Sequence, residues 1–398
     1  MTKEMSLRFQ KITVQNYRSL EHVELHAKDV NILFGPNGAG KSTFLDAIWF
    51  VRDCAIRGVD IAASDRSHGI GVLWDKAEPG SHIAIEIETE QAIYKVMFGF
   101  SSGRIEPFVG EKLTSKNHNR VLIERSIGSD KVRFWHSGIN RFAQIELREP
   151  EKLALSRYLD FEDNAYEAAE VDRLLRYTRK YHARSADIYR LKTFGSASNA
   201  HMRLYDRCEN LWSVLQNLKN EREIGDSSYD TIMLFMRKGF PTFDRIYLEQ
   251  LSANNVYGSF IETDHQEPIK ASGVSDGHLQ LLAHLTALFS EGNRPTLILF
   301  DEPEISLHPY ALAVFAEAVE EAASNWNKQI FVATHSPVLI SQFDADKIIA
   351  AEIGPNGQTV MQRVSEMADI QDLLAEYAAG SLYMAELIAP QSKLEAAD

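Results

Sequence analysis

Residues 35–42 of the chain read Gly35-Pro36-Asn37-Gly38-Ala39-Gly40-Lys41-Ser42. They fit the pattern G-x-x-x-x-G-K-[ST], in which glycines let the backbone wrap closely around a phosphate chain and point several N–H groups at the anion. The apolar run 30–34 before them predicts a buried strand, and the run 43–50 after them predicts a helix. Because the pattern requires strand, loop and helix in this order, the sequence predicts a nucleoside triphosphate site.

Individual side chains of this loop have separate tasks in such a site. Lys41 is expected to reach the β and γ phosphates and to take part in catalysis. Ser42 is expected to place its hydroxyl on Mg²⁺, which prefers hard oxygen ligands, and Thr43 is counted with the loop as a nucleotide contact. The alternative is a glycine-rich turn without a ligand, and the flanking strand and helix weigh against it.

A second apolar strand is expected at 296–300, and it ends in two adjacent carboxylates, Asp301 and Glu302. At the tip of a parallel strand beside the phosphate loop, Asp301 would hold Mg²⁺ through its water shell. Glu302 would polarise the attacking water as a general base. The alternative for this pair is a solvated acidic turn after a strand.

Two further runs complete the set of motifs. A strand expected at 330–334 ends in His335, whose imidazole would contact the γ phosphate or hold the attacking water and Glu302 in place. A lone histidine after a strand is more often structural, but its spacing after Glu302 favours a role in the site. Residues 275–277, Ser-Asp-Gly, precede a helix expected at 279–289, where a hydroxyl and glycine amides suit a phosphate. An ordinary N-cap turn is the alternative there.

The order of these four motifs resembles that of ATP-binding cassette ATPases of the SMC and RecF kind. Within them the chain is most similar to the OLD-like group, on the strength of Gln15-Asn16-Tyr17-Arg18-Ser19-Leu20, the run 275–277, and Asp301-Glu302-Pro303-Glu304 followed by Leu307-His308-Pro309. The resemblance implies an α/β fold, a P-loop NTPase head with an antiparallel β meander and an inserted helical lobe. It covers both flanking segments of the chain and leaves out the middle lobe.

The resemblance also implies how the site is completed. In such ATPases two heads meet head to tail, so Ser275 and Gly277 would contact the γ phosphate held by the partner's phosphate loop, and residues 305–308 would form an interface loop. One copy of each motif is present, which agrees with a homodimer or a higher oligomer. Arg18 would approach the nucleotide, although an exposed arginine after an edge strand needs no ligand.

The chain departs from the family pattern at several points. Asp276 replaces a glycine and His278 replaces the glutamine of the transporter signature. Gln91 is a candidate for the glutamine loop by position only. The stretch after His335 is too short for the Toprim nuclease domain of full-length OLD nucleases, and we expect none.

Periodicity divides the chain into four parts. We expect residues 1–147 to form the first half of the ATPase head, with a strand meander over 80–147, and residues 148–267 to form an inserted, mainly helical lobe. Residues 268–352 are expected to form the second half of the head, and residues 353–398 a C-terminal extension with helical character over 370–388.

Composition bounds the setting and the partners. The net charge of −14 argues against a surface that is basic all over, and the two cysteines, Cys54 and Cys208, form no metal or redox motif. Apolar runs are too short to span a bilayer, so we expect a cytoplasmic protein with no membrane partner. A basic run on an expected helical stretch, interleaved with Tyr177 and Tyr181, would follow a nucleic-acid backbone or would be a solvated face: Arg173, Arg176, Arg179, Lys180, Arg184 and Arg190.

Two functions follow, both with ATP and Mg²⁺ as cofactors. The first is a slow ATPase switch that dimerises on ATP and controls a separately encoded effector or a nucleic-acid transaction in phage defence or DNA repair. The second is a regulatory scaffold whose ATP-dependent dimer binds another protein without nucleic acid. A transporter ATPase fits less well, because the inserted lobe and the run 275–277 do not suit it.

Overall fold

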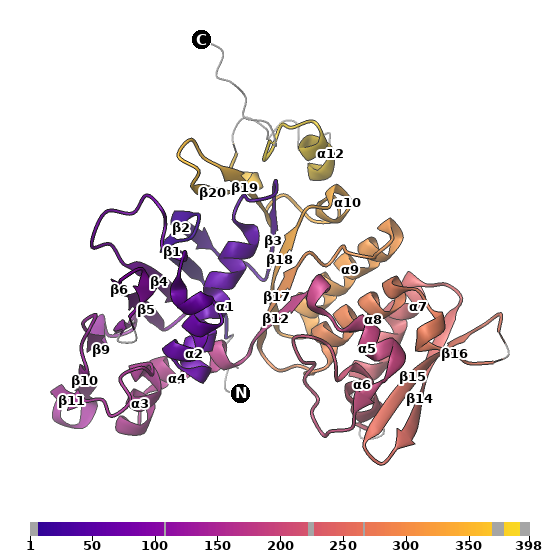
Figure 1. Ribbon diagram of the computed structural model, residues 1–398, viewed down its shortest axis with the longest axis horizontal. Helices are drawn as coiled ribbons and strands as arrows, with labels where there is room; N and C mark the ends of the chain where they lie inside the picture. The colour runs from indigo at the N-terminus through magenta and orange to yellow at the C-terminus, as the bar shows by residue number, and fades with distance from the viewer. Residues whose placement is uncertain (1–6, 107–108, 222–226, 266, 368–377, 391–398) are drawn as a thin grey trace, which may run out of the picture.

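The structure is a computed structural model, and it describes residues 7–106, 109–221, 227–265, 267–367 and 378–390. A six-stranded sheet lies at its centre in the order β12-β17-β18-β3-β19-β20, and all neighbours in it are parallel except β19 and β20. Figure 1 shows the N-terminal β3 beside β18 from the last third of the chain. The strands are β3 (Val30–Phe34), β12 (Thr178–His182), β17 (Thr296–Asp301), β18 (Lys328–Thr334), β19 (Ile348–Ile353) and β20 (Thr359–Arg363).

This central sheet is covered on both faces, which explains why its strands are continuous apolar runs. Every residue of β3, β17 and β18 is buried. Successive side chains of β17 alternate between two cores, so that Leu297 and Leu299 pack on one face and Ile298 and Phe300 on the other. The sheet is therefore a rigid platform, and its motifs follow the strands at their carboxyl ends.

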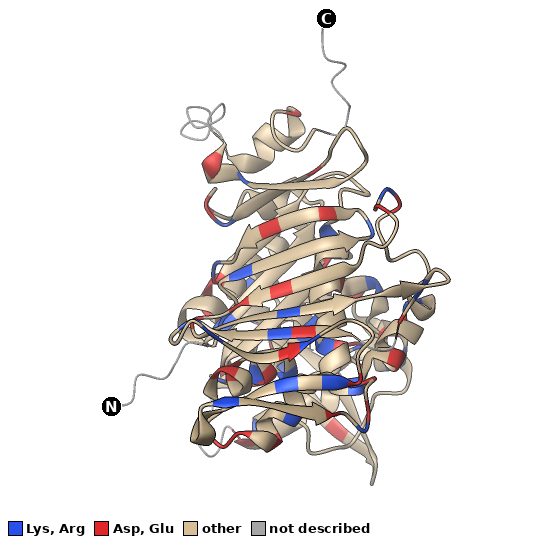
Figure 2. Cartoon of the chain, turned by 90° about the vertical axis from the view of Figure 1, so that its left-hand side faces the viewer, with Lys and Arg blue, Asp and Glu red and all other residues tan. Residues whose placement is uncertain are grey.

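One face of the central sheet packs against helix α1 (Lys41–Arg57) and, beyond it, an antiparallel sheet of eight strands in the order β11-β10-β9-β8-β5-β4-β1-β2. Acidic and basic residues are intermixed along its strands (Figure 2). The strands are β1 (Lys11–Tyr17), β2 (Leu20–His26), β4 (Ile83–Glu88), β5 (Ala92–Phe98), β8 (Gly110–Ser115), β9 (Arg120–Arg125), β10 (Lys131–His136) and β11 (Arg141–Glu146), with the small pair β6 (Phe100–Ser101) and β7 (Arg104–Ile105). The strand meander predicted over 80–147 is confirmed.

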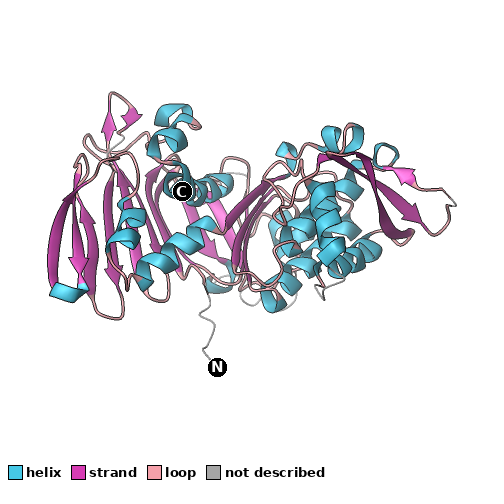
Figure 3. Ribbon diagram, turned by 90° about the horizontal axis from the view of Figure 1, so that it is seen from below, coloured by secondary structure: helices cyan, strands magenta, loops and turns pink. Residues whose placement is uncertain are grey.

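The other face of the central sheet packs against helices α8 (Asp276–Phe289) and α9 (Pro309–Asn325). Around them lie further helices and a small sheet of β13, β14, β15 and β16 (Figures 1 and 3). These elements are α5 (Ile188–Thr193), α6 (Leu211–Glu221), α7 (Ser228–Gly239), β13 (Ser196–Ala197), β14 (Phe243–Ser252), β15 (Asn255–Glu262) and β16 (Ile269–Lys270).

The segment 148–267 differs from the single, mainly helical lobe that we expected. Helices α3 (Ala154–Phe161) and α4 (Tyr166–Arg176) join the core beneath the antiparallel sheet, and β12 adds an edge strand to the central sheet. The lobe proper begins only after β12. Periodicity missed β12 because its partner, β17, lies more than a hundred residues further along the chain.

The C-terminal part also differs from a separate extension after residue 352. Strand β20 continues the central sheet, and α12 (Ala379–Met384) packs through Tyr383, whose ring lies 5.2 Å from that of Phe34. The helical character expected over 370–388 falls partly on 368–377, outside the described residues. Among the described residues, the other α-helices are α2 (Val59–Ser64) and α10 (Pro337–Ile340). Within the described ranges, no helix combines the length and the apolar character needed to cross a membrane.

Candidate nucleotide site

The loop of residues 35–42 connects β3 to α1 and has the backbone that its glycines predict. Gly35, Gly38 and Gly40 all have positive φ angles, of 150°, 81° and 92°. A Cβ on Gly40 would lie 2.1 Å from Thr359 Oγ1, and one on Gly35 would lie 2.0 Å from the carbonyl oxygen of Ala351. Both β20 and β19 therefore press against the loop, and only glycine fits at these two positions.

Lys41 begins α1 and folds over the loop. Its Nζ donates to the carbonyl oxygens of Gly35 and Pro36, each at 2.9 Å, and lies 3.3 Å from His335 Nδ1. Burial lowers the pKa of Lys41 to about 8, against the opposing pull of nearby carboxylates such as Glu304. The ammonium thus lies in a water-poor position where it can exchange carbonyl partners for phosphate oxygens.

Ser42 and Asp301 meet at the junction of α1 and β17. The Ser42 hydroxyl donates to Asp301 Oδ1 at 2.7 Å, and Asp301 is only 2% exposed. A hydroxyl and a carboxylate side by side form a hard oxygen pair of the kind that Mg²⁺ prefers. No group of three or more His, Cys, Asp or Glu side chains suited to a metal occurs in the described part of the chain, so the remaining ligands would be phosphate oxygens and waters. The residues present therefore fit Mg²⁺.

Glu302 and His335 follow neighbouring strands, β17 and β18, and face each other. Glu302 Oε1 lies 4.0 Å from His335 Nε2, and the Glu302 backbone has φ 53°. Positive φ is uncommon for a non-glycine residue and is maintained only where the surroundings enforce it. Here the Glu302 N–H donates to the carbonyl oxygen of Ala333 at 2.8 Å, which fixes the turn.

The surroundings of His335 disfavour protonation of its imidazole. Burial, followed by the charge of Lys41, lowers the pKa of His335. A lysine ammonium can only donate, so its contact with Nδ1 requires that nitrogen to accept. A neutral ring between Lys41 and Glu302 can orient a water or a phosphate oxygen without adding a second positive charge.

Three contacts at the site were not predicted from the sequence. Glu304 Oε1 accepts from the His335 N–H at 2.7 Å, its Oε2 is buried without a hydrogen-bond partner, and burial raises the pKa of this carboxyl group. Ser19 and Thr359 hydrogen-bond each other at 2.8 Å against Gly40. Arg184 Nε donates to Glu302 Oε2 at 2.9 Å. Of these three contacts, only that of Glu304 could have been expected from nearby sequence, because Glu304 follows Glu302 closely.

The run 275–277 lies at the start of α8. Ser275 Oγ is 2.8 Å from His278 Nδ1, and a Cβ on Gly277 would come within 2.6 Å of the carbonyl oxygen of Ser306. The expected interface loop 305–308 is thus packed beside this signature loop. Helix α8 belongs to the core on one face of the central sheet and α1 to the core on the other. The helices that follow the phosphate loop and the signature loop therefore pack on opposite faces of the sheet.

Arg18 lies beside the nucleotide loop in the structure. It shares a cavity of about 500 Å³ with Ser42, Thr43 and Asp301, and its guanidinium lies 3.4 Å from Asp46. Gln91 does not lie there. It lines a different cavity, formed by the antiparallel sheet and α4, because it sits in the turn between β4 and β5. Its position therefore does not support Gln91 as the candidate for the glutamine loop.

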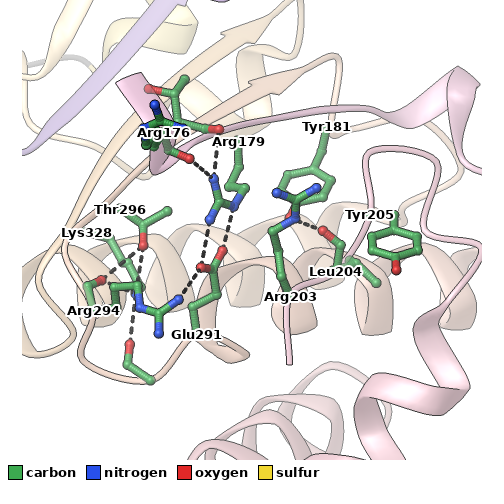
Figure 4. Close-up of polar contacts among 12 residues, drawn as sticks. Arg176, Arg179, Tyr181, Arg203, Leu204, Tyr205, Glu291, Arg294, Thr296 and Lys328 are labelled. Atoms are coloured by element: carbon green, nitrogen blue, oxygen red, sulfur yellow. Dashed lines mark hydrogen bonds and ion pairs between the residues drawn. The ribbon is translucent and has the colours of Figure 1, made fainter. Parts of the chain in front are cut away.

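The basic run that was expected on one helical stretch is divided among several elements and is mostly paired with acids. Arg179, on β12, forms two bonds to Glu291, from Nε at 2.6 Å and from Nη2 at 2.8 Å (Figure 4). Arg176 pairs with Asp172 on α4, and Arg184 pairs with Glu302. The interpretation of this run as one continuous stripe for a phosphate backbone was wrong, because β12 interrupts the helix.

Comparisons with known proteins agree with this geometry. A family described as "AAA domain, putative AbiEii toxin, Type IV TA system" matches residues 30–341, and one described as "P-loop containing region of AAA domain" matches residues 8–51. Endonuclease GajA of Bacillus cereus is 21% identical over 371 residues, covering 86% of this chain and 58% of GajA. OLD nuclease of Thermus scotoductus is 22% identical over 357 residues, covering 85% of this chain and 61% of that protein.

A shorter match is the DNA replication and repair protein RecF of Bacteroides fragilis, 28% identical over 171 residues, or 42% of this chain and 41% of RecF. The chain thus spans 41 to 61% of the length of these three relatives. Among solved structures, an Smc head bound to the C-winged helix domain of ScpA superposes with a TM-score of 0.53 at 16% identity, over 90% of this chain and 99% of that chain. An Smc head domain with an extended coiled coil, derived from Pyrococcus furiosus, superposes with a TM-score of 0.52 at 14% identity, over 92% of this chain and 99% of that chain. These likenesses show the fold.

Proposed function

Because this chain belongs to the AAA-domain family that matches residues 30–341, and is an ATPase of the SMC, RecF and OLD-like kind, we propose that it closes head to tail with a second copy on binding ATP and Mg²⁺. Slow hydrolysis would then reopen the pair, so that ATP acts as a switch. One observation carries the proposal: α1 and α8 pack on opposite faces of the central sheet. Two chains related by a two-fold axis would bring the loop at α1 of one chain to the loop at α8 of the other.

The residues of the phosphate loop supply binding in this proposal. Loop amides and Lys41 would bind the phosphates, and Arg18, which lines the adjoining cavity, would contribute a further positive charge. Ser42 and Asp301 would hold Mg²⁺, which neutralises charge on the phosphates when it is bound. From the partner, Ser275 and Gly277 would complete the site.

The residues at the ends of β17 and β18 supply the chemistry. Glu302 would accept a proton from water, and the neutral His335, 4.0 Å away, would orient that water or the γ phosphate. Their backbone is fixed by hydrogen bonds to Ala333 and Glu304. The pair is thus pre-organised before substrate arrives, which favours the transition state over the ground state.

The downstream role is proposed from the relatives. GajA is named an endonuclease and RecF a DNA replication and repair protein. By likeness, the ATP-dependent pair would control a separately encoded effector or a nucleic-acid transaction in phage defence or DNA repair. A protein-binding scaffold is the second candidate. It is favoured by the burial of Arg179 against Glu291 and by the pairing of Arg176 with Asp172, which leave less unpaired positive charge for a nucleic acid.

The test is the mass of the full chain with and without ATP and Mg²⁺, measured together with ATP turnover. We expect Glu302→Gln to abolish turnover and to accumulate a dimer in ATP, because the nucleotide stays uncleaved between the heads. Glu249→Gln, an exposed matched substitution on β14, should behave as wild type. An unchanged mass in ATP, or turnover that survives Glu302→Gln, would contradict the proposal. Stimulation by DNA that falls steeply with salt would favour the nucleic-acid role over the scaffold.

A further inference from the structure

The segment from Ala183 to Lys192 leads from the end of β12 into α5. The parallel register of β12 with β17 sets His182 opposite Asp301. The residues that follow His182 therefore leave the sheet at the strand end that carries Glu302. Helix α5 then reaches the start of α8, where the signature loop lies. The segment thus contacts both halves of the nucleotide chemistry within one head.

At its first end the segment holds the catalytic carboxylate. Arg184 Nε donates to Glu302 Oε2 at 2.9 Å, so one of the two carboxylate oxygens is occupied by a guanidinium. The Arg184 side chain is 70% exposed. An exposed ion pair of this kind contributes little to stability and is readily exchanged. These properties suit a contact that is made and broken during a reaction cycle.

At its second end the segment is tied to the signature loop and, through Tyr257, to Ser272 just before that loop. Lys192 Nζ lies 2.5 Å from Asp276 Oδ1, on the residue between Ser275 and Gly277. The Tyr257 hydroxyl donates to the carbonyl oxygen of Lys192 at 2.7 Å and accepts from the Ser272 N–H at 3.2 Å. A displacement of the signature loop would therefore be passed to the end of α5.

Between these ends the segment has little freedom to absorb a displacement. Leu191 is fully buried, and its carbonyl oxygen accepts from Trp212 Nε1 at 3.1 Å. The Asp187 carboxylate caps α5 by accepting from the Arg190 N–H at 3.1 Å, and the Asp187 N–H donates to the carbonyl oxygen of Arg207 at 2.9 Å. Packed, hydrogen-bonded segments move as units and transmit small shifts.

We propose that residues 183–192 couple the two half-sites of a head: docking of the partner's nucleotide at the signature loop shifts α5 and withdraws Arg184 from Glu302. Arg184 is then a positioning residue that blocks the general base until the opposite site is filled. This inference rests on the proposed head-to-tail function. It adds that a head hydrolyses its own ATP only when its signature loop is engaged by the second copy.

Epistasis between the two ends of the segment tests the coupling. ATP turnover of the full chain is measured at one protein concentration for Lys192→Gln, Arg184→Gln and the double variant. We expect Lys192→Gln to lower turnover by about tenfold, within the usual range for coupling between two sites. Arg184→Gln should raise turnover, because nothing then blocks Glu302. The double variant should turn over ATP as fast as Arg184→Gln, because the contact of Lys192 is no longer needed to withdraw Arg184. A merely structural defect at Lys192 would not be restored by a second substitution.

Control variants, together with the mass of each variant in ATP, distinguish a failure of the coupling from a failure of the proposed function. Lys219→Gln on α6 and Arg157→Gln on α3, an exposed arginine that also pairs with a carboxylate, should leave turnover unchanged. Lys192→Gln should still form the ATP-dependent dimer. A double variant as slow as Lys192→Gln, or a loss of turnover in Arg184→Gln, would overturn the coupling while leaving the dimer intact. Failure of every variant to change mass in ATP would instead overturn the proposed function.

Discussion

Glu302 has a left-handed backbone, with φ 53°, at the end of an otherwise regular strand. Strain of this kind persists where neighbouring structure enforces it, and here the turn is tied to Ala333 on β18. The expectation that Glu302 acts as a general base follows from its place after Asp301 in the sequence. Its partner Arg184 does not, because 118 residues separate the two. Local spacing predicts which residues enter the site, and tertiary contacts decide what holds them.

Gly40 offers a prediction at the same scale, with Gly38 as its control. Both have positive φ, but a Cβ on Gly40 would collide with Thr359 whereas one on Gly38 meets nothing within 4 Å. We expect Gly38→Ala to cost about 1 kcal/mol of stability, the usual cost of a left-handed alanine. Gly40→Ala should cost about 2 kcal/mol more, because the loop or β20 must shift, and should weaken ATP binding. Denaturant unfolding and equilibrium nucleotide binding measure the two effects. Equal stabilities for the two variants would contradict the close approach of β20 to the loop.

Among the elements, β3, β17 and β18 were predicted from their apolar runs and the motifs that end them, and β12 was not. Residues 178–182 are short, basic and aromatic, so they read as a continuation of the helical pattern before them. These residues form a strand because they pair with β17, which is remote in sequence and supplies their backbone hydrogen-bond partners. The error displaced the start of the lobe and merged residues of two elements into one basic run.

Arg179 allows a test of this corrected assignment. Its side chain is 7% exposed and that of Glu291 is 5% exposed, so the pair is buried between β12 and the end of α8 (Figure 4). We expect Arg179→Ala to destabilise the chain by about 3 kcal/mol, since it leaves a buried carboxylate undercompensated. Arg176→Ala, which removes an arginine that is 49% exposed, should cost no more than about 0.5 kcal/mol. If thermal or denaturant unfolding showed equal, small losses of stability for Arg179→Ala and Arg176→Ala, the burial of Arg179 would be contradicted.

At the scale of the whole molecule, the sequence predicted the class of head and the order of its motifs, because each motif ends a core strand or begins a helix. It did not predict that α3 and α4 pack beneath the antiparallel sheet or that β20 supports the nucleotide loop. The separation of α1 and α8 by the central sheet is likewise a property of the assembled fold. That separation supports our proposal that a complete site takes its two loops from two chains.

Mixing two inactive variants tests this claim most directly. Lys41→Ala removes the phosphate-loop lysine, and Gly277→Asp places a charge in the signature loop against Ser306. Each variant alone should turn over almost no ATP. In an equimolar mixture of the two variants, each also carrying Arg184→Gln so that the proposed block on Glu302 is absent, half of the dimers pair an intact phosphate loop with an intact signature loop at one of two sites. Turnover should then return to about a quarter of that of Arg184→Gln alone. A mixture as inactive as its components would contradict a site shared between two heads.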